Sequence, residues 1–416
     1  MTANAELEDY RLRAREWLGA NMTPVGAAVV SPAGAEVEAA QVARARRLQR
    51  KLHDGGFSGI TFPVEYGGQG LSTQHQRIFT DESVPYEMPL LFNVPTLGIL
   101  AATLLDFGTE EQKCRHLPAI LKGEELWVQF LSEPAGGSDL AGCITRATRD
   151  GDVYILNGSK IWTSGAYRSD YAMCLARTDW DVPKHRGLTM FVVKIHQRGI
   201  QIDRIRQVNG SMEFCQEFFD DVTIPAEDVV GEVNDGWTVA SRLLFHERAS
   251  VGGASPYTSG EGEVGGGGRL PDMRWLAQHA GRNGDPHVRQ LVAESHVLDV
   301  VHRQFVDRLA MGMRTGYFPG PAGALVRLYA GEMAVRRSDI SMEIAGSGAV
   351  ASGADDVTFL YGEWFLGRQA SCLGGGSTEI ARNIISERVL GMPREHAADR
   401  DVPFSQVKGN ELSSRR

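Results

Sequence analysis

Hydrophobic residues at the start of the chain recur with the period of an α-helix. Over residues 5–22, Leu7, Tyr10, Ala14 and Leu18 fall on one face, while charged residues fill the opposite face. The same period continues through three further segments, at residues 36–53, 73–84 and 96–107. No sequence motif accompanies this pattern, so periodicity alone predicts a helical domain over residues 1–125.

The pattern changes at Trp127, where short runs of β-forming residues alternate with turn signals. Asp150-Gly151 and Asn157-Gly158 each separate two apolar runs, and such dipeptides are strong signals for a β-hairpin. Similar runs continue to about Ile224. We predict that residues 126–232 form a middle domain, an antiparallel β barrel or sandwich.

Helical periodicity returns after Gly231 and indicates a bundle of long helices. The predicted helices cover residues 237–249, 288–309, 324–345 and 378–390. The fold class is therefore multidomain α+β, with an N-terminal helical domain, the middle β domain and a C-terminal four-helix bundle over residues 233–394. Gly252–Gly268 lacks the Lys-Ser/Thr of a phosphate-binding loop, so we predict a flexible surface connection. Residues 395–416 form a polar tail, which we expect to be disordered.

Composition narrows the functional classes. The 416 residues carry a formal net charge of −9 and no block of lysine or arginine, which argues against nucleic acid as a partner. No apolar run approaches the length of about 20 residues that a transmembrane helix needs, and the N-terminus has no apolar signal-peptide core. Five scattered cysteines show neither CxxC nor metal-ligand spacing, so we expect buried thiols, a cytoplasmic location and no metal site.

Two stretches in the middle domain have the residues of a ligand-binding loop. In WVQFLSEPAGGSDL, residues 127–140, an apolar run ends in a proline and two glycines, whose backbone amides form a donor surface for an anionic or carbonyl-rich cofactor. An ordinary tight loop after a buried strand is the alternative. In KIWTSG, residues 160–165, an indole and two hydroxyls follow a strand. Trp162 is either a core residue or a cover for a flat aromatic cofactor whose edge Ser164 binds.

The third stretch is Phe245-His246-Glu247-Arg248, which interrupts an otherwise apolar helix. Because consecutive helical residues point about 100° apart, Glu247 and Arg248 cannot both face solvent unless the helix is only shallowly packed. One interpretation is a satisfied ion pair at the edge of the bundle. The other is a carboxylate held near a buried substrate as a general base.

Together these stretches resemble the acyl-CoA dehydrogenases, with FLSEPAGGSD and NGSKIWTSGA in the β domain, then HER and GGGSTEIARNIISERVLGMP in the helical bundle. The resemblance extends from about Glu6 to Arg394. It implies FAD as cofactor, an acyl-CoA as substrate, an electron-transfer flavoprotein as electron acceptor, and a homo- or hetero-oligomer, either a dimer or a tetramer. The FAD-binding residues implied within one chain are Gln129, Phe130, Leu131, Ser132, Ser138, Trp162, Thr163, Ser164, Ser377, Thr378 and Glu379. Those implied to reach the FAD of a neighbouring subunit are Arg282 and Gly346.

One departure from the family pattern bears on the mechanism. Most members have Tyr-Glu-Gly-Thr before the last helix, and that glutamate is the base, but here residues 374–377 are Gly-Gly-Gly-Ser. Members resembling isovaleryl-CoA dehydrogenase place the base on the bundle helix, immediately before an arginine, which is the position of Glu247. The resemblance thus implies that Glu247 removes the α-proton and that the Gly375 N–H binds the thioester oxygen. The substrate contacts that it implies are Ser138, Arg248 and Gly376.

Two other functions remain open. A flavin oxidase or monooxygenase on the same scaffold would pass its electrons to oxygen. A non-catalytic or half-site subunit of a heteromeric dehydrogenase would lack its own base or half of its FAD site. The missing glutamate at Gly375 favours that second alternative, and the presence of Glu247 argues against it. The glycines at 374–376 leave room for a bulky or branched acyl group, but the sequence does not determine the length or branching of the substrate.

Overall fold

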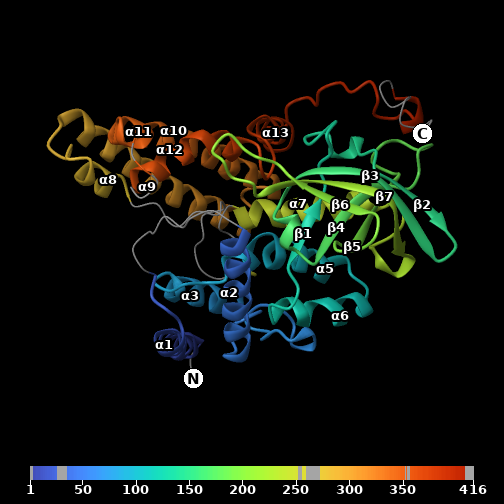
Figure 1. Ribbon diagram of the computed structural model, residues 1–416, viewed down its shortest axis with the longest axis horizontal. Helices are drawn as coiled ribbons and strands as arrows, with labels where there is room; N and C mark the ends of the chain where they lie inside the picture. Colours follow the sequence, from blue (N-terminus) through green and yellow to red (C-terminus); the bar gives the residue numbers. More distant parts are fainter. Residues whose placement is uncertain are drawn as a thin grey trace.

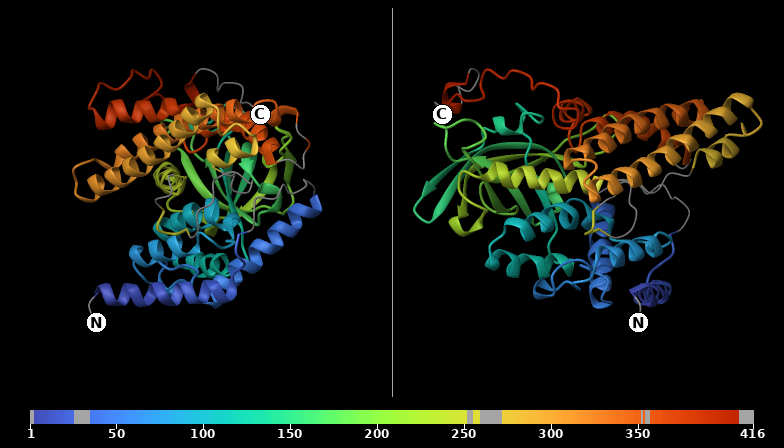
Figure 2. Two further views of the ribbon diagram at one scale, coloured as in Figure 1. Left: turned by 90° about the vertical axis from the view of Figure 1, so that its left-hand side faces the viewer. Right: turned by 180° about the vertical axis from the view of Figure 1, so that it is seen from behind.

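The computed structural model has three parts, which follow each other along the chain (Figure 1). The structure describes residues 3–25, 35–251, 255–258, 272–351, 353 and 357–407. The N-terminal helices lie along one side of a central β-sheet, and the C-terminal helices extend away from it as an elongated bundle (Figures 1 and 2). This arrangement confirms the predicted α+β class, with helical, β and helical parts in that order.

The N-terminal part is helical, as its apolar periodicity predicts. α1 (Ala3–Asn21) packs on α3 (Thr73–Ser83), and Leu18 and Phe79 are buried in their shared core. The further helices are α2 (Ala35–Asp54), α4 (Leu90–Phe92), α5 (Ala102–Phe107) and α6 (Glu110–Leu121), with a 3₁₀ turn at Val64–Tyr66 and a π-helical segment at Asn93–Ala101.

One segment of this part is more apolar than expected. Leu90–Phe107 spans 18 residues with a mean hydropathy of 1.7, which matches a membrane-spanning helix by length and composition and corrects the expectation that no such run exists. The structure buries 61% of this segment, and Leu97, Leu100 and Leu104 pack in the central core beside Trp127. We therefore interpret Leu90–Phe107 as a core segment of the folded chain, because a buried core helix has the same composition.

The middle part is one sheet with the strand order β6-β7-β3-β2-β4-β5-β8, and β1 pairs with β4 beside this path. The strands are β1 (Trp127–Phe130), β2 (Arg146–Asp150), β3 (Val153–Ser164), β4 (Tyr171–Arg177), β5 (Leu188–Lys194), β6 (Ile200–Arg204), β7 (Phe214–Pro225) and β8 (Val229–Val230). Most pairs are antiparallel, as predicted, but β1 and β2 each run parallel to β4. The sheet contributes to two cores, since Val128 and Cys174 belong to one and their neighbours Trp127 and Met173 to the other.

Asn157-Gly158 is not a turn. β3 continues through both residues to Ser164, whereas the β2–β3 hairpin turns at Gly151, as the first dipeptide predicts. The pairing of β3 with β7 shifts register between Leu156 and Gly158, where Gly158 adopts a φ of +141° in a β-bulge. The prediction of a second hairpin is therefore wrong, because a glycine inside a strand serves a bulge as well as a turn.

The C-terminal part contains the predicted bundle. Its helices are α7 (Gly236–Val251), α8 (Met273–His279), α9 (Pro286–Arg314), α10 (Gly323–Ala345), α11 (Gly348–Ala351), α12 (Val357–Gly367) and α13 (Thr378–Ile384). α9 and α10 pack along each other, with Leu291 and Ile340 buried in a core to which Tyr361 of α12 also belongs. The helix predicted at 378–390 changes character at Ile384, since residues 385–389 are π-helical.

The polar tail is not disordered throughout. Residues 395–407 lie along the loop between β4 and β5, where the Phe404 N–H donates to the Val182 carbonyl oxygen. The Phe404 ring is buried, and the Arg177 guanidinium lies 3.6 Å from its centroid. The expectation of disorder is therefore wrong for this stretch. Residues 408–416 and all of the predicted connection 252–268 except 255–258 lie outside the described residues.

Candidate active site

β1 and α7 bring together the two residues around which the site is built. The Gln129 Nε2 on β1 donates a hydrogen bond to the Glu247 Oε2 on α7, at 3.0 Å. On α7, Ala240 and Leu243 lie two turns and one turn before Glu247 and are both fully buried, so all three residues share the inward face. The Glu247 side chain faces the interior rather than the edge of the bundle, whereas Arg248 is only partly buried.

The surroundings of Glu247 act on its pKa in opposite directions. Burial raises the pKa above its ordinary value, while the Gln129 N–H, the Arg248 charge, the Gly375 N–H and the Arg327 charge favour the ionised form. The effect of the Gly375 N–H on this pKa places the glycine segment before α13 near the inward face of α7. Buried carboxylates with raised pKa values are characteristic of functional sites.

The glycine segment at 374–376 has a backbone that requires glycine. Gly375 and Gly376 adopt φ values of +73° and +91°. The Gly374 carbonyl accepts a hydrogen bond of 2.6 Å from the Nη2 of Arg327, a buried side chain on α10. Sequence reasoning missed Arg327, although a lone arginine inside the apolar stretch ALVRLYA was a signal.

The turn after β1 is closed by its own backbone. Glu133 and Gly136 exchange two N–H···O bonds, of 3.1 and 3.0 Å. The Ile161 N–H of β3 donates to the Ser132 carbonyl at 2.9 Å, which ties the turn to the strand that carries KIWTSG. The two stretches predicted to bind a cofactor therefore lie side by side, and Ser138 at the far end of the turn is exposed.

A second β-bulge in β3 presents Trp162. Pairing with β7 slips between Ile161 and Thr163, and Trp162 adopts a φ of +68°, a left-handed conformation that is strained for an aromatic residue. The indole is 55% exposed and meets Phe214 edge-on, with ring centroids 6.0 Å apart. The alternative of Trp162 as a core residue is therefore wrong, because the bulge turns the indole outward together with the exposed Ser164.

Three of the predicted cofactor residues in the β domain point their side chains into the protein. Phe130, Leu131 and Thr163 are all buried, so only their main chain is available to a ligand. The Thr163 hydroxyl donates to the Glu217 Oε2 of β7 at 3.1 Å. Burial raises the pKa of Glu217 to about 8, which favours the neutral carboxylic acid beneath the bulge. Sequence reasoning missed Glu217, whose carboxyl group is buried in β7.

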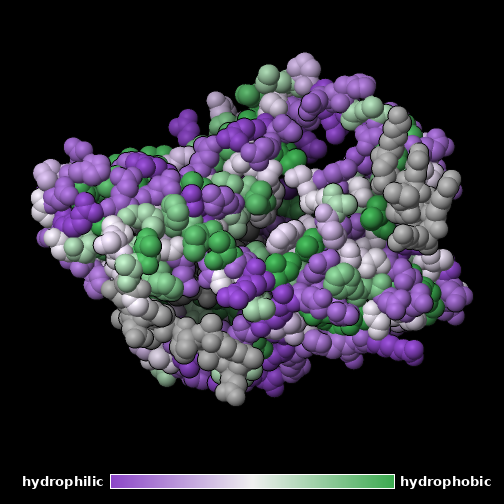
Figure 3. All heavy atoms as spheres, turned by 45° about the horizontal axis from the view of Figure 1, so that its top comes forward, coloured by the Kyte–Doolittle hydropathy of each residue, from purple (hydrophilic) through white to green (hydrophobic). Residues whose placement is uncertain are grey.

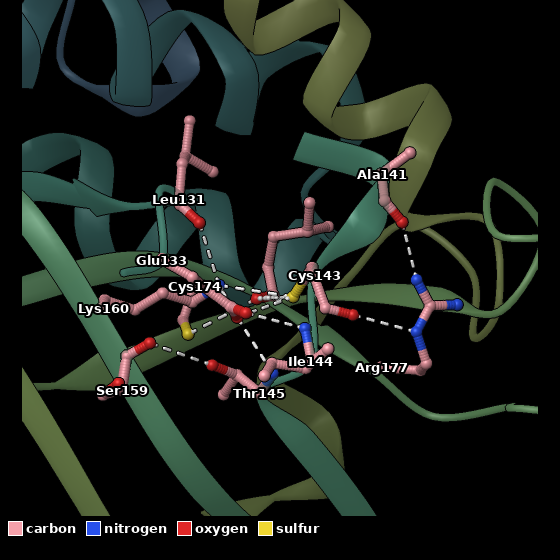
Figure 4. A network of polar contacts seen from close by, with 11 residues as sticks. Leu131, Glu133, Ala141, Cys143, Ile144, Thr145, Ser159, Lys160, Cys174 and Arg177 are labelled. Carbon is pink, nitrogen blue, oxygen red and sulfur yellow. Dashed lines mark hydrogen bonds and ion pairs between the residues drawn. The ribbon is translucent and has the colours of Figure 1, made fainter. Parts of the chain in front are cut away.

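A buried ion pair supports the turn from beneath (Figure 4). Lys160 of β3 donates to the Glu133 Oε1 at 2.8 Å and to the Leu131 carbonyl at 2.9 Å. Glu133 also accepts the N–H groups of Ile144 and Thr145, at 2.7 and 2.9 Å. Burial alone would raise the pKa of Glu133, but the Lys160 ammonium and these hydrogen bonds lower it to about 2. The ion pair therefore remains charged and fixes the segment from Leu131 to Glu133, where the turn begins.

Arg177 supports the chain just after the turn (Figure 4). Its Nη2 donates to the Ala141 carbonyl at 2.7 Å and its Nε to the Cys143 carbonyl at 2.9 Å. Burial raises the pKa of the Cys143 thiol to about 12, so this thiol is not a nucleophile. All five cysteines are free, but Cys114 is exposed, contrary to the expectation that all are buried.

The remaining predicted residues fall into two places. Ser377 caps α13, where its hydroxyl accepts the Ile380 N–H at 3.2 Å, and Thr378 and Glu379 begin that helix. Arg282 lies beside Gly346, because its Nη1 donates to the Glu343 carbonyl of the last turn of α10. α8 and this end of α10 lie at the end of the bundle that is remote from β1 (Figures 1 and 2).

Family models match the three parts of the chain in order. The models described as "Acyl-CoA dehydrogenase, N-terminal domain", "middle domain" and "C-terminal domain" match residues 6–124, 129–222 and 234–390. Among curated relatives, acyl-CoA dehydrogenase IpdE1 of Mycobacterium tuberculosis is 34% identical over 395 residues, which cover 94% of this chain and 99% of that protein. The mitochondrial isovaleryl-CoA dehydrogenase of Pongo abelii is 32% identical over 214 residues, which cover 50% of each chain.

Two solved structures share the fold over nearly their whole length. The structure titled "Tcur3481-Tcur3483 steroid ACAD" has a TM-score of 0.73 at 27% identity, covering 94% of this chain and 98% of that one. The ChsE4-ChsE5 complex from Mycobacterium tuberculosis has a TM-score of 0.72 at 27% identity, with the same coverage of both chains. Because the family models span the chain and a relative above 30% identity matches nearly all of it, this chain belongs to the acyl-CoA dehydrogenase family of flavoprotein oxidoreductases.

Proposed function

We propose that this chain catalyses the α,β-dehydrogenation of an acyl-CoA thioester to the trans-2-enoyl-CoA, with Glu247 as the base. The observation that carries the proposal is the buried Glu247 carboxylate, which accepts a hydrogen bond of 3.0 Å from the Gln129 Nε2 and whose pKa the nearby Gly375 N–H lowers. Removal of an α-proton needs a base at the α-carbon and a donor at the adjacent carbonyl oxygen, each within about 3 Å of its atom. Glu247 supplies the carboxylate that the glycine segment lacks.

Glu247 accepts the α-proton in this proposal. Its pKa is already raised by burial, and a substrate that displaces the remaining water would make it a stronger base. The Gly375 N–H stabilises the negative charge that moves onto the thioester oxygen as the proton leaves. Both groups act on the same step, because the α-proton becomes acidic only as that oxygen takes up charge. Ser138, Arg248 and Gly376 contact the rest of the substrate.

The residues on β3 and in the turn after β1 fit FAD. Trp162 offers a flat, exposed indole, and the exposed Ser164 and the main chain at Ser132 offer polar groups beside it. The strained bulge holds the indole outward before any ligand arrives, which is the arrangement expected of a preformed binding surface. When bound, FAD supplies the acceptor for the hydride that leaves the β-carbon. We further propose that an electron-transfer flavoprotein reoxidises the enzyme.

We infer that the acyl group is bulky and ring-bearing. The segment 374–376 places no side chain where most family members carry a glutamate, and nothing lies within 4 Å of a Cβ built on Gly376. One structural neighbour is titled a steroid ACAD. Hydrophobic residues also gather near the middle of the face seen in Figure 3.

Substitution of Glu247 with glutamine tests the proposal. We expect Glu247→Gln to retain FAD and to reduce it at least about 10³-fold more slowly with acyl-CoA, because the amide accepts no proton at this pH. The measurement is anaerobic bleaching of the flavin by a panel of straight-chain, branched and steroid-derived CoA thioesters. Glu363→Gln, at a half-buried glutamate on α12, is the matched control and should behave as the wild type. Full bleaching by Glu247→Gln would refute the assignment of the base.

The same preparation distinguishes the two alternative functions. Rapid peroxide formation from acyl-CoA without an added acceptor would identify an oxidase or monooxygenase. Fewer than one FAD per purified subunit, with no bleaching by any thioester, would identify a half-site subunit of a heteromeric enzyme. One FAD per subunit that bleaches anaerobically and reoxidises only slowly in air supports the dehydrogenase.

A further inference from the structure

The family resemblance implies that Gln129 binds FAD, yet its side chain is already engaged by another group. Its Nε2 donates to the Glu247 Oε2 at 3.0 Å, and its Oε1 is buried without a hydrogen-bond partner among the described residues. The orientation follows from chemistry, since the amide nitrogen is the only side-chain atom of a glutamine that can donate to a carboxylate. The amide therefore presents its donor to the base and not to a cofactor.

We propose that Gln129 is a positioning residue, which holds the Glu247 carboxylate by its Oε2 and leaves the Oε1 free for the α-proton. The inference rests on the proposed function of Glu247. A glutamate has three rotatable side-chain bonds, and one fixed donor selects a single arrangement from the rotamers they allow. The donor itself is fixed, because β1 pairs along its length with β4 and Gln129 stands opposite the buried Met173.

Gln129 differs from the other donor to this carboxylate. The Gly375 N–H also favours the ionised form of Glu247, but the proposed mechanism gives that N–H to the thioester oxygen once substrate binds. Gln129 has no such second role, so its hydrogen bond persists through the reaction. Substrate would then remove one stabilising donor from the carboxylate and leave the other, which increases the basicity of Glu247 without releasing its side chain.

The charged groups around Glu247 make the contribution of Gln129 measurable. Arg248 of the same helix and Arg327 of α10 both favour the ionised carboxylate, and neither depends on Gln129. Burial raises the pKa of Glu247, and loss of the Gln129 donor removes one of the groups that lower it. The pKa of Glu247 should therefore rise further in a variant that lacks this donor, while both arginines stay in place.

The experiment compares Gln129→Leu and Gln129→Glu with the wild-type holoenzyme. Gln201→Leu is the matched control, because Gln201 also lies on a strand and donates to a carboxylate, the exposed Asp203 Oδ1, at 3.1 Å. We measure FAD per subunit and the rate of anaerobic flavin reduction as a function of pH. Gln129→Leu should keep its FAD, react about tenfold more slowly near neutral pH, and reach half its maximal rate at a higher pH than the wild type.

Gln129→Glu keeps the shape of the side chain, so it tests the same inference if the leucine variant does not fold. Its carboxylate would repel Glu247, and the pH of half-maximal rate should move further upward than in Gln129→Leu. An unchanged pH profile in both variants would overturn the inference. Loss of FAD from both, with an unchanged pH profile after reconstitution, would assign Gln129 to the cofactor instead.

A separate readout keeps this inference distinct from the proposed function. The Glu247 carboxyl can be titrated in the infrared without substrate, by the band that Glu247→Gln removes. If no acyl-CoA reduces the wild-type flavin, the proposed function fails, and this titration still tests the contact. A higher titration midpoint in Gln129→Leu supports the positioning of Glu247 by Gln129, and an identical midpoint contradicts it.

Discussion

Lys160 and Glu133 show how two buried charges shape the site without facing a ligand. Neither side chain is more than 5% exposed, and removing two such charges from water is costly. Here every group is engaged, since Lys160 also donates to the Leu131 carbonyl and Glu133 also accepts two backbone N–H groups. The charges therefore fix the main chain on both sides of Ser132, which keeps the turn in one conformation.

Removal of the cation should reveal this role. We expect Lys160→Met to lower the free energy of unfolding by about 3–5 kcal/mol, because Glu133 becomes a buried carboxylate without a counter-charge. FAD content should fall as well, since the Leu131 carbonyl loses its donor. Urea denaturation gives the stability, and Lys113→Met serves as the control because its partner Glu110 is exposed, so that a loss below about 1 kcal/mol is expected. A loss in Lys160→Met no larger than in the control would contradict the argument.

The same pair predicts a component of acid stability. The pKa of Glu133 is about 2 in the folded chain against 4.5 in a model peptide, so its contribution is complete above pH 4.5 and is lost as the pH falls toward 2. The size of this contribution is about 3 kcal/mol. In Glu133→Gln the free energy of unfolding should therefore fall less steeply across this window than in the wild type. Parallel slopes measured by urea denaturation between pH 5 and pH 3 would be the contrary result.

At the scale of residues, the sequence revealed side chains that belong to a motif and missed those that act through partners distant in the chain. Glu247 stands out because it interrupts an apolar helix. Lys160 looks like an ordinary charge, and the apolar stretch around Arg327 marks that arginine without naming its partner. Their partners lie 27 and 47 residues away and are a carboxylate and a carbonyl that only the fold brings near. Glu217 was missed for the same reason, because Thr163 stands on another strand.

At the scale of elements, β3 positions the site by interrupting its own regularity. Its pairing with β7 shifts register on either side of Lys160, at Gly158, where β7 carries the extra residue, and at Trp162, which is itself the extra residue of β3. An extra residue reverses which face the following side chains of its strand occupy, and in β3 this reversal comes at Trp162. Lys160 can therefore point into the sheet core while Trp162 points outward, only two residues later. A regular strand would place both on the same face.

The first bulge can be tested at Gly158. A Cβ there would lie 2.8 Å from the Thr145 Cα, and the φ of +141° is unfavourable for any other residue. We expect Gly158→Ala to lower the free energy of unfolding by about 3 kcal/mol and to reduce FAD content, as the register of β3 is disturbed. Gly151→Ala is the control, because it has a φ of +58° but open space around it, which gives a cost of about 1 kcal/mol. If Gly158→Ala and Gly151→Ala lose the same free energy of unfolding, measured by heat and by urea, the bulge does not contribute to stability.

Elements with a strong period were predictable, and those without one were not. The helical stripe at 288–309 and the alternation in β2 and β3 appear where they were expected. α12 was missed because its sequence, VTFLYGEWFLG, is apolar on nearly all sides and has no polar face to mark a helical period. The parallel pairing of β1 with β4 was also unpredictable, because side-chain alternation is the same in parallel and antiparallel strands.

At the scale of the whole molecule, the predicted cofactor residues do not meet in one chain. Trp162 and Ser164 lie on the β-sheet, whereas Arg282 and Gly346 lie together at the remote end of the bundle (Figure 1). A single FAD cannot be reached by both groups of the same chain if the proposed roles hold. In a symmetric dimer, each bundle end can complete the site of the other subunit. The titles of two structural neighbours, the Tcur3481-Tcur3483 steroid ACAD and the ChsE4-ChsE5 complex, each name two proteins.

Mixing two inactive variants decides whether the site is shared between subunits. Glu247→Gln removes the base but keeps Arg282, and Arg282→Ala keeps the base but removes the group proposed to reach a neighbouring FAD. Each alone should be inactive, with circular dichroism confirming that both are folded. In a co-expressed mixed dimer, one of the two sites combines an intact Glu247 with an intact Arg282 from the other chain. Random pairing should then restore about a quarter of the wild-type activity.

If both groups served the same site within one chain, the mixture would stay inactive, because every site would contain one of the two changes. Activity in the mixture therefore requires that Arg282 acts across the interface. A mixture that stays inactive, although each variant assembles as the wild type does, would contradict a role of Arg282 across the interface. If the wild-type chain also holds fewer than one FAD per subunit, the second half of the site comes from a different chain, and purification with that chain should raise the FAD content to one per Glu247-bearing subunit.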